Sequence, residues 1–276
     1  MRKIMLGEVS LNLSRFGFGT SRLFNVASPR LRQRLLATAY EHGITHFDTA
    51  PLYGFGVAER DLKTLLAAHP DATVATKVGL YPPGGADQPA FSVFFRKVAG
   101  RIVPALSKVI VDWSIDRARK SLNGSLRRLG RERIDLYLLH EPEAHLLATD
   151  EWRAWLDSER DRVKAFGIAC EAAKLPAFFV GEHPLARIVQ CSDSISGTEA
   201  DVLIRAGRPL QITYGYITAA KRDPKPDIEA VLIAALRRNS QGCILVSTSK
   251  EERIRRFAEL LEKYDNSSNL APVHKL

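Results

Sequence analysis

Four side chains with complementary proton chemistry stand at the ends of short apolar runs in this 276-residue sequence. Asp48 ends one run and Tyr53 follows it by five residues, Lys77 ends the next run, and His140 follows the one after. A tyrosine, with a pKa of about 10, is a poor acid at neutral pH until a nearby cation favours its phenolate. Lys77 would supply that cation, Asp48 would hold the ammonium, and His140 would hydrogen-bond a substrate oxygen. The set predicts proton delivery to a carbonyl oxygen.

Each of these residues alone has a more ordinary interpretation. A lysine and an aspartate at strand ends more often form a surface ion pair, and a tyrosine there is more often a partly buried phenol. Four complementary groups at the ends of three successive runs favour a shared site over coincidence.

The elements that position these residues alternate along the chain. We predict eight strands, at Arg15–Thr20, Thr45–Asp48, Thr73–Lys77, Asp135–Leu139, Ala165–Ala169, Arg187–Cys191, Leu210–Thr213 and Cys243–Val246. A helix is predicted after each, at Arg30–Glu41, Val57–Ala68, Ile115–Leu129, Asp150–Glu159, Glu171–Phe179, Glu199–Arg205, Asp227–Arg238 and Lys250–Tyr264. Eight such units match an α/β fold of the (β/α)8 TIM-barrel type better than a doubly wound open sheet. We therefore expect residues 1–276 to form one barrel domain, with its active site at the C-terminal ends of the strands.

Three segments depart from this alternation. Residues 2–13 predict a short N-terminal β-hairpin with its turn near Gly7-Glu8. Residues 79–113 form a long loop insertion that is too apolar for disorder, and we expect it to fold over another part of the molecule near the active site. Residues 266–276 are polar and lack periodicity, which is typical of a mobile tail. Four aromatic residues could line the pocket or pack under a lid: Phe55, Tyr81, Phe94 and Phe95.

Composition narrows the class of protein. The net charge is +9, but the densest basic cluster, residues 127–133, lies at a predicted helix end and has no interleaved aromatics, so nucleic acid is not an expected partner. No run of eighteen apolar residues and no signal-peptide core occur, so we expect a cytoplasmic protein without a membrane partner. Cys170, Cys191 and Cys243 are predicted to be reduced and buried, and no metal-ligand cluster is apparent.

The segment after the eighth predicted strand is a candidate phosphate site. Barrels often bind phosphate there with backbone N–H groups at a helix start, and this segment adds the hydroxyls of Ser247, Thr248 and Ser249 and the guanidinium of Arg253. The alternative is a capping box with Ser249 as N-cap, and the two interpretations are compatible. The run Gly17–Thr20 lacks the third glycine of a dinucleotide fingerprint and predicts only a tight strand end.

The stretch His46–Gly54, with Glu59 after it, closely resembles the signature of the aldo-keto reductase family. Lys77 and the run Leu136–His140 fall where that family places its lysine and histidine. The resemblance implies an NADP(H)- or NAD(H)-dependent oxidoreductase that acts on a small-molecule aldehyde, ketone or sugar. It also implies that Tyr53 is the acid/base, that Lys77 and Asp48 tune it, and that His140 orients the carbonyl.

The same resemblance assigns a cofactor site, and several residues of this chain differ from the family pattern there. It implies nicotinamide contacts from Gly19, Thr20, Asp48, Gln190 and Tyr214, and adenosine-phosphate contacts from Ser247, Thr248, Ser249 and Arg253. Family members commonly hold the carboxamide with Ser-Asn after strand five, where this chain has Ala169-Cys170, so part of that grip is lost or replaced. Ser247 stands where many members have lysine, and Arg256-Phe257 where many have Glu-Asn. Arg253 favours NADP(H). The family often closes the substrate pocket with its C-terminus, which is short here, and the insertion 79–113 would take over that wall.

Two other functions fit parts of the pattern. A cofactor-binding regulatory or interaction protein with the same barrel and little turnover would account for Ala169-Cys170 and the apolar insertion. A barrel hydrolase or isomerase without nicotinamide has less support, because the strand ends carry neither paired carboxylates nor a metal-ligand cluster.

Overall fold

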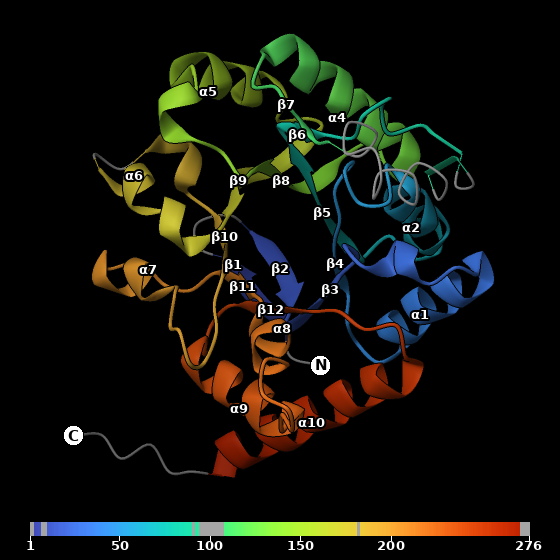
Figure 1. The fold of residues 1–276 in the computed structure, drawn as a ribbon, viewed down its shortest axis with the longest axis vertical. Helices are drawn as coiled ribbons and strands as arrows, with labels where there is room; N and C mark the ends of the chain where they lie inside the picture. Colours follow the sequence, from blue (N-terminus) through green and yellow to red (C-terminus); the bar gives the residue numbers. More distant parts are fainter. Residues whose placement is uncertain (1–2, 7–9, 90–91, 94–107, 181–182, 271–276) are drawn as a thin grey trace.

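Eight parallel strands form a closed barrel in the computed structural model, which describes residues 3–6, 10–89, 92–93, 108–180 and 183–270 (Figure 1). The strands are β3 (Phe16–Gly19), β4 (His46–Asp48), β5 (Thr73–Val78), β8 (Ile134–His140), β9 (Val163–Cys170), β10 (Val189–Ser192), β11 (Ile212–Tyr214) and β12 (Cys243–Val246). Each predicted strand is confirmed, with ends that differ by no more than two residues. The (β/α)8 barrel is therefore the fold of this chain.

Helices surround the barrel (Figure 1). They are α1 (Pro29–Glu41), α2 (Val57–Ala68), α4 (Ile115–Leu129), α5 (Thr149–Ser158), α6 (Pro176–Phe179), α7 (Asp201–Arg205), α8 (Tyr216–Ala220), α9 (Ile228–Arg238) and α10 (Glu251–Leu270), with short 3-10 turns η1 (Leu23–Asn25), η3 (Ala144–Leu146), η4 (Ala172–Lys174) and η5 (Pro184–Ala186). Their ends follow local chemistry: the Ser28 hydroxyl accepts from Leu31 N at the start of α1, with Pro29 at the first helical position. None of the described helices is both long enough and apolar enough to cross a membrane.

Two apolar layers hold the barrel together because successive strand side chains point to opposite faces. On β8, Leu136 and Leu138 pack inside the barrel, while Tyr137 and Leu139 pack outward against the helices. The polar residues at the strand ends continue the same alternation. The strand geometry that buries the apolar side chains therefore also sets the direction of these polar side chains.

The predicted N-terminal hairpin is confirmed. β1 (Lys3–Leu6) pairs antiparallel with β2 (Leu11–Ser14), and the predicted turn lies outside the described residues. The apolar side chains of both strands, Ile4, Leu6, Leu11 and Leu13, are buried in the cluster that fills the barrel interior. The hairpin therefore contributes directly to the inner core.

The helices differ from the prediction at three places. The predicted helix Glu171–Phe179 is wrong as a continuous element: it is η4 followed by the four-residue α6, which starts at Pro176 because proline lacks the N–H of a helix interior. The short α8 was not predicted. Residues 266–270 of the predicted tail continue α10, which is therefore longer than predicted, while residues 271–276 lie outside the described part.

The insertion 79–113 begins and ends as a small antiparallel pair, β6 (Leu80–Tyr81) with β7 (Ile110–Val111). Its described middle part lies against α2: Arg60 donates to Ala86 O at 2.8 Å and to Gln88 O at 2.7 Å. Phe94 and Phe95 lie outside the described residues.

Candidate active site

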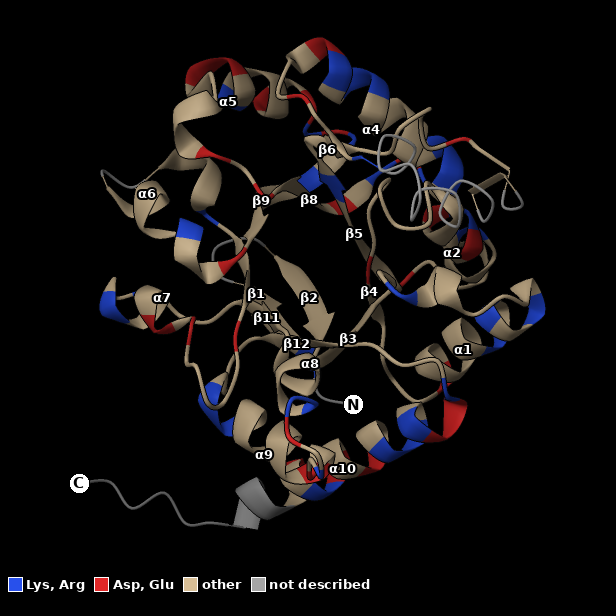
Figure 2. Cartoon of the chain, in the orientation of Figure 1, with Lys and Arg blue, Asp and Glu red and all other residues tan. Residues whose placement is uncertain are grey.

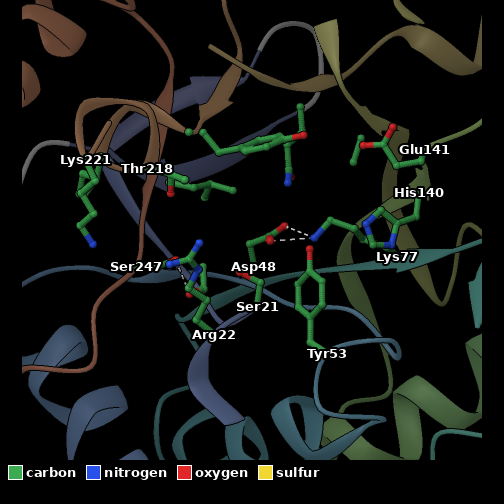
Figure 3. A pocket seen from close by; sticks show the side chains of 17 residues that line it. Ser21, Arg22, Asp48, Tyr53, Lys77, His140, Glu141, Thr218, Lys221 and Ser247 are labelled. Atoms are coloured by element: carbon green, nitrogen blue, oxygen red, sulfur yellow. Dashed lines mark hydrogen bonds and ion pairs between the residues drawn. The ribbon is translucent and has the colours of Figure 1, made fainter. Parts of the chain in front are cut away.

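One pocket opens at the C-terminal ends of the barrel strands (Figure 3). Strand register assembles it, because Gly19, Asp48 and Ala75 are neighbours on β3, β4 and β5, and His140, Ala169 and Gln190 are neighbours on β8, β9 and β10. Its lining residues are Gly19, Ser21, Arg22, Asp48, Tyr53, Lys77, His140, Glu141, Ala169, Gln190, Tyr214, Gly215, Ile217, Thr218, Lys221, Leu245 and Ser247. All four residues of the predicted proton-delivery set are brought together.

A buried ion pair forms the floor of this pocket. Lys77 Nζ lies 2.7 Å from both carboxylate oxygens of Asp48 and donates to Thr49 O at 3.0 Å. The two side chains are 1% and 4% exposed, so solvent screens their attraction little. Burial lowers the pKa of Lys77, but Asp48 and Tyr53 outweigh that effect and leave the pKa raised. The ammonium is therefore charged and fixed in place.

Tyr53 projects toward this pair from the turn after β4 (Figure 3). Lys77 Nζ lies 4.8 Å from the centroid of its ring. The turn depends on Gly54, whose φ is 58° and where an added Cβ would come within 2.9 Å of Phe24. Burial raises the pKa of Tyr53 above its ordinary value, and Lys77 acts in the opposite direction. The phenol is thus protonated at neutral pH and has a cation beside it that favours its anion.

His140 completes the set from the end of β8. Its ring meets that of Tyr53 edge-on, with centroids 5.9 Å apart and an interplanar angle of 87°. Burial, assisted by Lys77 and Lys174, lowers the pKa of His140 to about 3. Nδ1 is buried and finds no hydrogen-bond partner among the described residues. The imidazole is therefore neutral at physiological pH, with unused hydrogen-bonding capacity.

The predicted cofactor residues divide into three groups. Gly19, Gln190, Tyr214 and Ser247 line the pocket together with Asp48. Thr20 lies beneath it, fully buried, with its hydroxyl donating to Asp48 O at 2.9 Å. The remaining predicted residues, Thr248, Ser249 and Arg253, do not line the pocket, and α10 begins at Glu251, one residue later than predicted.

Ala169 and Cys170, the pair that departs from the family pattern after strand five, place their side chains on opposite faces of the strand. Ala169 lines the pocket with only a methyl group. Cys170, like Cys191 on the neighbouring strand, faces the helix layer and is fully buried, and burial raises the pKa of both thiols. The three cysteines are free and buried, as predicted.

Sequence reasoning missed several lining residues. Arg22 and Lys221 bring exposed cations to one side of the pocket, and Glu141 brings a carboxylate to the other (Figure 3). Arg22 follows the first strand and Glu141 follows His140, so inspecting two residues past every strand would have found them. Lys221 depends on α8, which begins after Gly215 at a φ of 107°.

The insertion does not form the predicted wall in its described part, since none of its described residues lines the pocket. Val93 packs instead with Phe55 and Val57, beside the turn that carries Tyr53, and Tyr81 is buried in the main core. Phe55 and Tyr81 are therefore packing residues.

Comparison with known proteins identifies relatives of this chain. The model of the aldo/keto reductase family matches residues 15–172. D-threo-aldose 1-dehydrogenase of a Pseudomonas species is 33% identical over 57% of this chain and 50% of its own length. The chain spans about half or less of the length of the first curated relatives it matches.

Solved structures share the fold. An aldo-keto reductase of Bacillus halodurans in its holo form superposes with a TM-score of 0.72 at 19% identity, over 100% of this chain and 98% of that one. A Klebsiella pneumoniae aldo-keto reductase in complex with NADPH gives 0.65 at 16% identity, over 100% and 98%. With a family match over more than half of its length, this chain belongs to the aldo/keto reductase family.

Proposed function

We propose that this chain, as one barrel domain, is an NADP(H)-dependent oxidoreductase that interconverts an aldehyde, ketone or sugar carbonyl and its alcohol. The observation that carries the proposal is the assembly of Tyr53, His140 and the buried Lys77–Asp48 pair in one pocket. The family membership and the dehydrogenase name of the relative above support the same class of reaction.

In this proposal, Tyr53 is the general acid/base. Its phenol is protonated at neutral pH and can donate its proton to the oxygen of a carbonyl that is being reduced. The phenolate left behind lies beside the Lys77 ammonium, which stabilises it more strongly in this buried setting than water would. Asp48 keeps the ammonium in place, so the stabilising charge needs no rearrangement during the reaction.

His140 has an orienting role. A neutral imidazole can hydrogen-bond the carbonyl oxygen without adding a positive charge next to Lys77. Its edge-on contact with Tyr53 limits where that oxygen can lie. The substrate oxygen is thereby directed to the phenol proton.

The residues across the pocket fit a nicotinamide dinucleotide, which when bound would supply or accept the hydride. Gln190 Oε1 is buried without a partner in the described part of the chain, and the Tyr214 ring lines the same wall. Gly19 lines the same pocket beside Ser247, where an added Cβ would come within 2.9 Å of the Ser247 hydroxyl, so a larger residue would crowd this part of the wall. Arg22 and Lys221 offer positive charge for phosphates.

NADP(H) is the proposed form of the cofactor, with NAD(H) as the alternative. Arg253, with the hydroxyls of Thr248 and Ser249, stands where a 2′-phosphate is expected, outside the pocket itself. A guanidinium near that phosphate would favour NADP(H).

The alternative of a regulatory protein with little turnover has less support. The described part of the insertion packs beside α2 and lines no part of the pocket. The proton-delivery residues are assembled in spite of the Ala169-Cys170 departure.

The test is to mix the protein with NADPH, and in parallel with NADH, and a panel of aldehydes, ketones and sugars. We expect a substrate-dependent loss of nicotinamide absorbance, larger with NADPH. No loss with any member of a broad panel, under conditions in which the cofactor binds, would contradict the proposal.

A further inference from the structure

Glu141 has an unusual backbone conformation at the pocket. Its φ is 53°, in the left-handed region that favours glycine, and such a conformation costs about 1 kcal/mol or more in a residue with a side chain. Phe55 and Thr198 share a positive φ among the described non-glycine residues, but neither lines the pocket. A strained conformation persists only where the surrounding contacts fix it.

Those contacts hold the Glu141 carboxylate over the end of β9. Its backbone N–H donates to Ala169 O at 2.7 Å, and its carboxylate accepts from Glu171 N at 3.1 Å. Lys174 Nζ lies 3.3 Å from Glu141 Oε2 and also donates to Glu141 O at 3.3 Å. The side chain is 27% exposed, so one face of the carboxylate stays open to the pocket (Figure 3).

The wall beside Glu141 presents an acceptor on each side of Ala169. Ala169 pairs with His140, the residue before Glu141, on one side and with Gln190 on β10 on the other, and its methyl group offers no hydrogen bond. Cys170 points away into the helix layer. Gln190 Oε1 is a buried acceptor with no partner in the described residues, and an unpaired buried acceptor is costly unless a ligand donates to it.

Two acceptors that flank a methyl group suit a ligand with two N–H bonds on one nitrogen. A primary amide provides these, and its carbonyl oxygen can accept from the amide nitrogen of Gln190. A carboxylate or phosphate would meet only repulsion from Glu141. The ligand expected in this pocket that carries a primary amide is the nicotinamide ring.

We propose that Glu141, held by Lys174, binds the carboxamide NH2 of the nicotinamide and replaces the grip that Ala169 and Cys170 cannot supply. The assignment rests on the proposed function, since it requires a nicotinamide cofactor. It makes Glu141 a cofactor-binding residue, with Gln190 as its partner on the other side of Ala169.

The test uses calorimetric titration of the full chain with three ligands: NADP⁺, its acetylpyridine analogue, in which a methyl replaces the NH2, and adenosine 2′,5′-bisphosphate, which lacks the nicotinamide. The variants are Glu141→Ala, Glu141→Gln and the control Glu143→Ala. Glu143 is the other Lys174 partner, at 2.8 Å, and does not line the pocket. Circular dichroism and thermal unfolding check the fold of each variant.

We expect Glu141→Ala to weaken NADP⁺ binding about tenfold or more, the effect of losing a hydrogen bond to a charged group. Binding of the bisphosphate should change less than twofold. The wild type should prefer NADP⁺ to the analogue, and Glu141→Ala should abolish that preference. Glu141→Gln, which keeps an acceptor, should lose less, and Glu143→Ala should match the wild type.

Three outcomes would overturn the assignment: unchanged NADP⁺ affinity in Glu141→Ala, an equal change for NADP⁺ and the bisphosphate, or a preference for NADP⁺ that survives in Glu141→Ala. If Glu141→Ala does not fold, the same comparison of NADP⁺ with its analogue in Glu141→Gln decides between these outcomes. A wild type that binds neither NADP⁺ nor NAD⁺ would instead overturn the proposed function, and the inference with it.

Discussion

The two halves of the pocket rim differ in how far their polar groups are already paired. On the side of β4 and β5, Asp48 and Lys77 bond each other at 2.7 Å and are nearly inaccessible to solvent. On the side of β9 to β12, Ala169 offers no polar group and Gln190 keeps an unpaired buried oxygen. The first half is organised before any ligand binds, as charge stabilisation requires, whereas the second half needs a ligand to satisfy it.

Lysine and arginine residues lie all around the barrel (Figure 2), but those at the pocket differ in their partners. Near the first half, the buried cation already has its carboxylate. Near the second half, the exposed cations Arg22 and Lys221 have no ion pair among the described side chains. An anionic ligand would supply the missing partner.

The largest expected effect comes from breaking the paired half. Lys77→Met would leave Asp48 buried and uncompensated, which should lower the free energy of unfolding by about 3–5 kcal/mol. Urea denaturation measures it, with the exposed Lys120→Met as control. The double variant Asp48→Leu/Lys77→Met should be more stable than Lys77→Met alone. Equal stability of Lys77→Met and the wild type would show that Lys77 does not compensate a buried charge on Asp48.

A second expected effect is a pH dependence of stability from the buried histidines. Burial lowers the pKa of His140 and of His46 to about 3. As the pH falls, these histidines bind protons in the unfolded chain before they do so in the folded one. Their contribution to stability should therefore be complete above about pH 6.5 and be lost as the pH drops toward 3. Each buried histidine contributes up to about 1.4 kcal/mol per pH unit.

The histidine contribution can be isolated by substitution. His46→Asn should flatten the pH profile of the urea midpoint, whereas His145→Asn, at an exposed position, should leave it unchanged. Parallel profiles for the wild type and His46→Asn would show that His46 is not held neutral by the fold.

A smaller effect is expected in the half that needs a ligand. Arg22→Ala should weaken NADPH binding about fivefold to tenfold, by loss of a charge-assisted contact to phosphate, and the loss should shrink at high salt. Fluorescence titration measures the affinity, and the exposed Arg30→Ala on α1 is the control. Unchanged NADPH affinity in Arg22→Ala would show that Arg22 does not contact the phosphates of the cofactor.

The smallest expected effect concerns cofactor choice. Arg253→Ala should reduce the preference for NADPH over NADH about twofold to fivefold, since Arg253 is exposed and exposed ion pairs contribute little. Ratios of kcat/KM for the two cofactors report it. A preference that does not change would remove Arg253 from the 2′-phosphate site.

The barrel and the gathering of the polar strand-end residues could be predicted from the sequence because they follow from short-range patterns. Runs such as Leu136–Leu139 alternate between inner and outer faces, and parallel strands place Asp48, Lys77 and His140 at the same end. Those relations depend only on strand period and direction.

The cofactor half could not be predicted as well, because it depends on loop conformations that residue type does not specify. Glu141 reaches the pocket through a positive φ at a residue that rarely adopts one, and α8 starts at Gly215 with a φ of 107°. The predicted helix Glu171–Phe179 is interrupted at Pro176, although the spacing of its apolar residues favoured one continuous helix. Loops of this kind are set by tertiary contacts, such as the one from Lys174 to Glu141.

We infer that the two halves act separately, one in proton delivery and one in cofactor binding, and the variant Tyr53→Phe tests this division. Titration with NADPH followed by single-turnover mixing with a reducible carbonyl measures both steps on the same protein. We expect Tyr53→Phe to bind NADPH with an affinity within about twofold of the wild type and to transfer hydride at a rate reduced by roughly 10²–10⁴-fold. Undiminished turnover, or a loss of NADPH binding equal to the loss of rate, would contradict it.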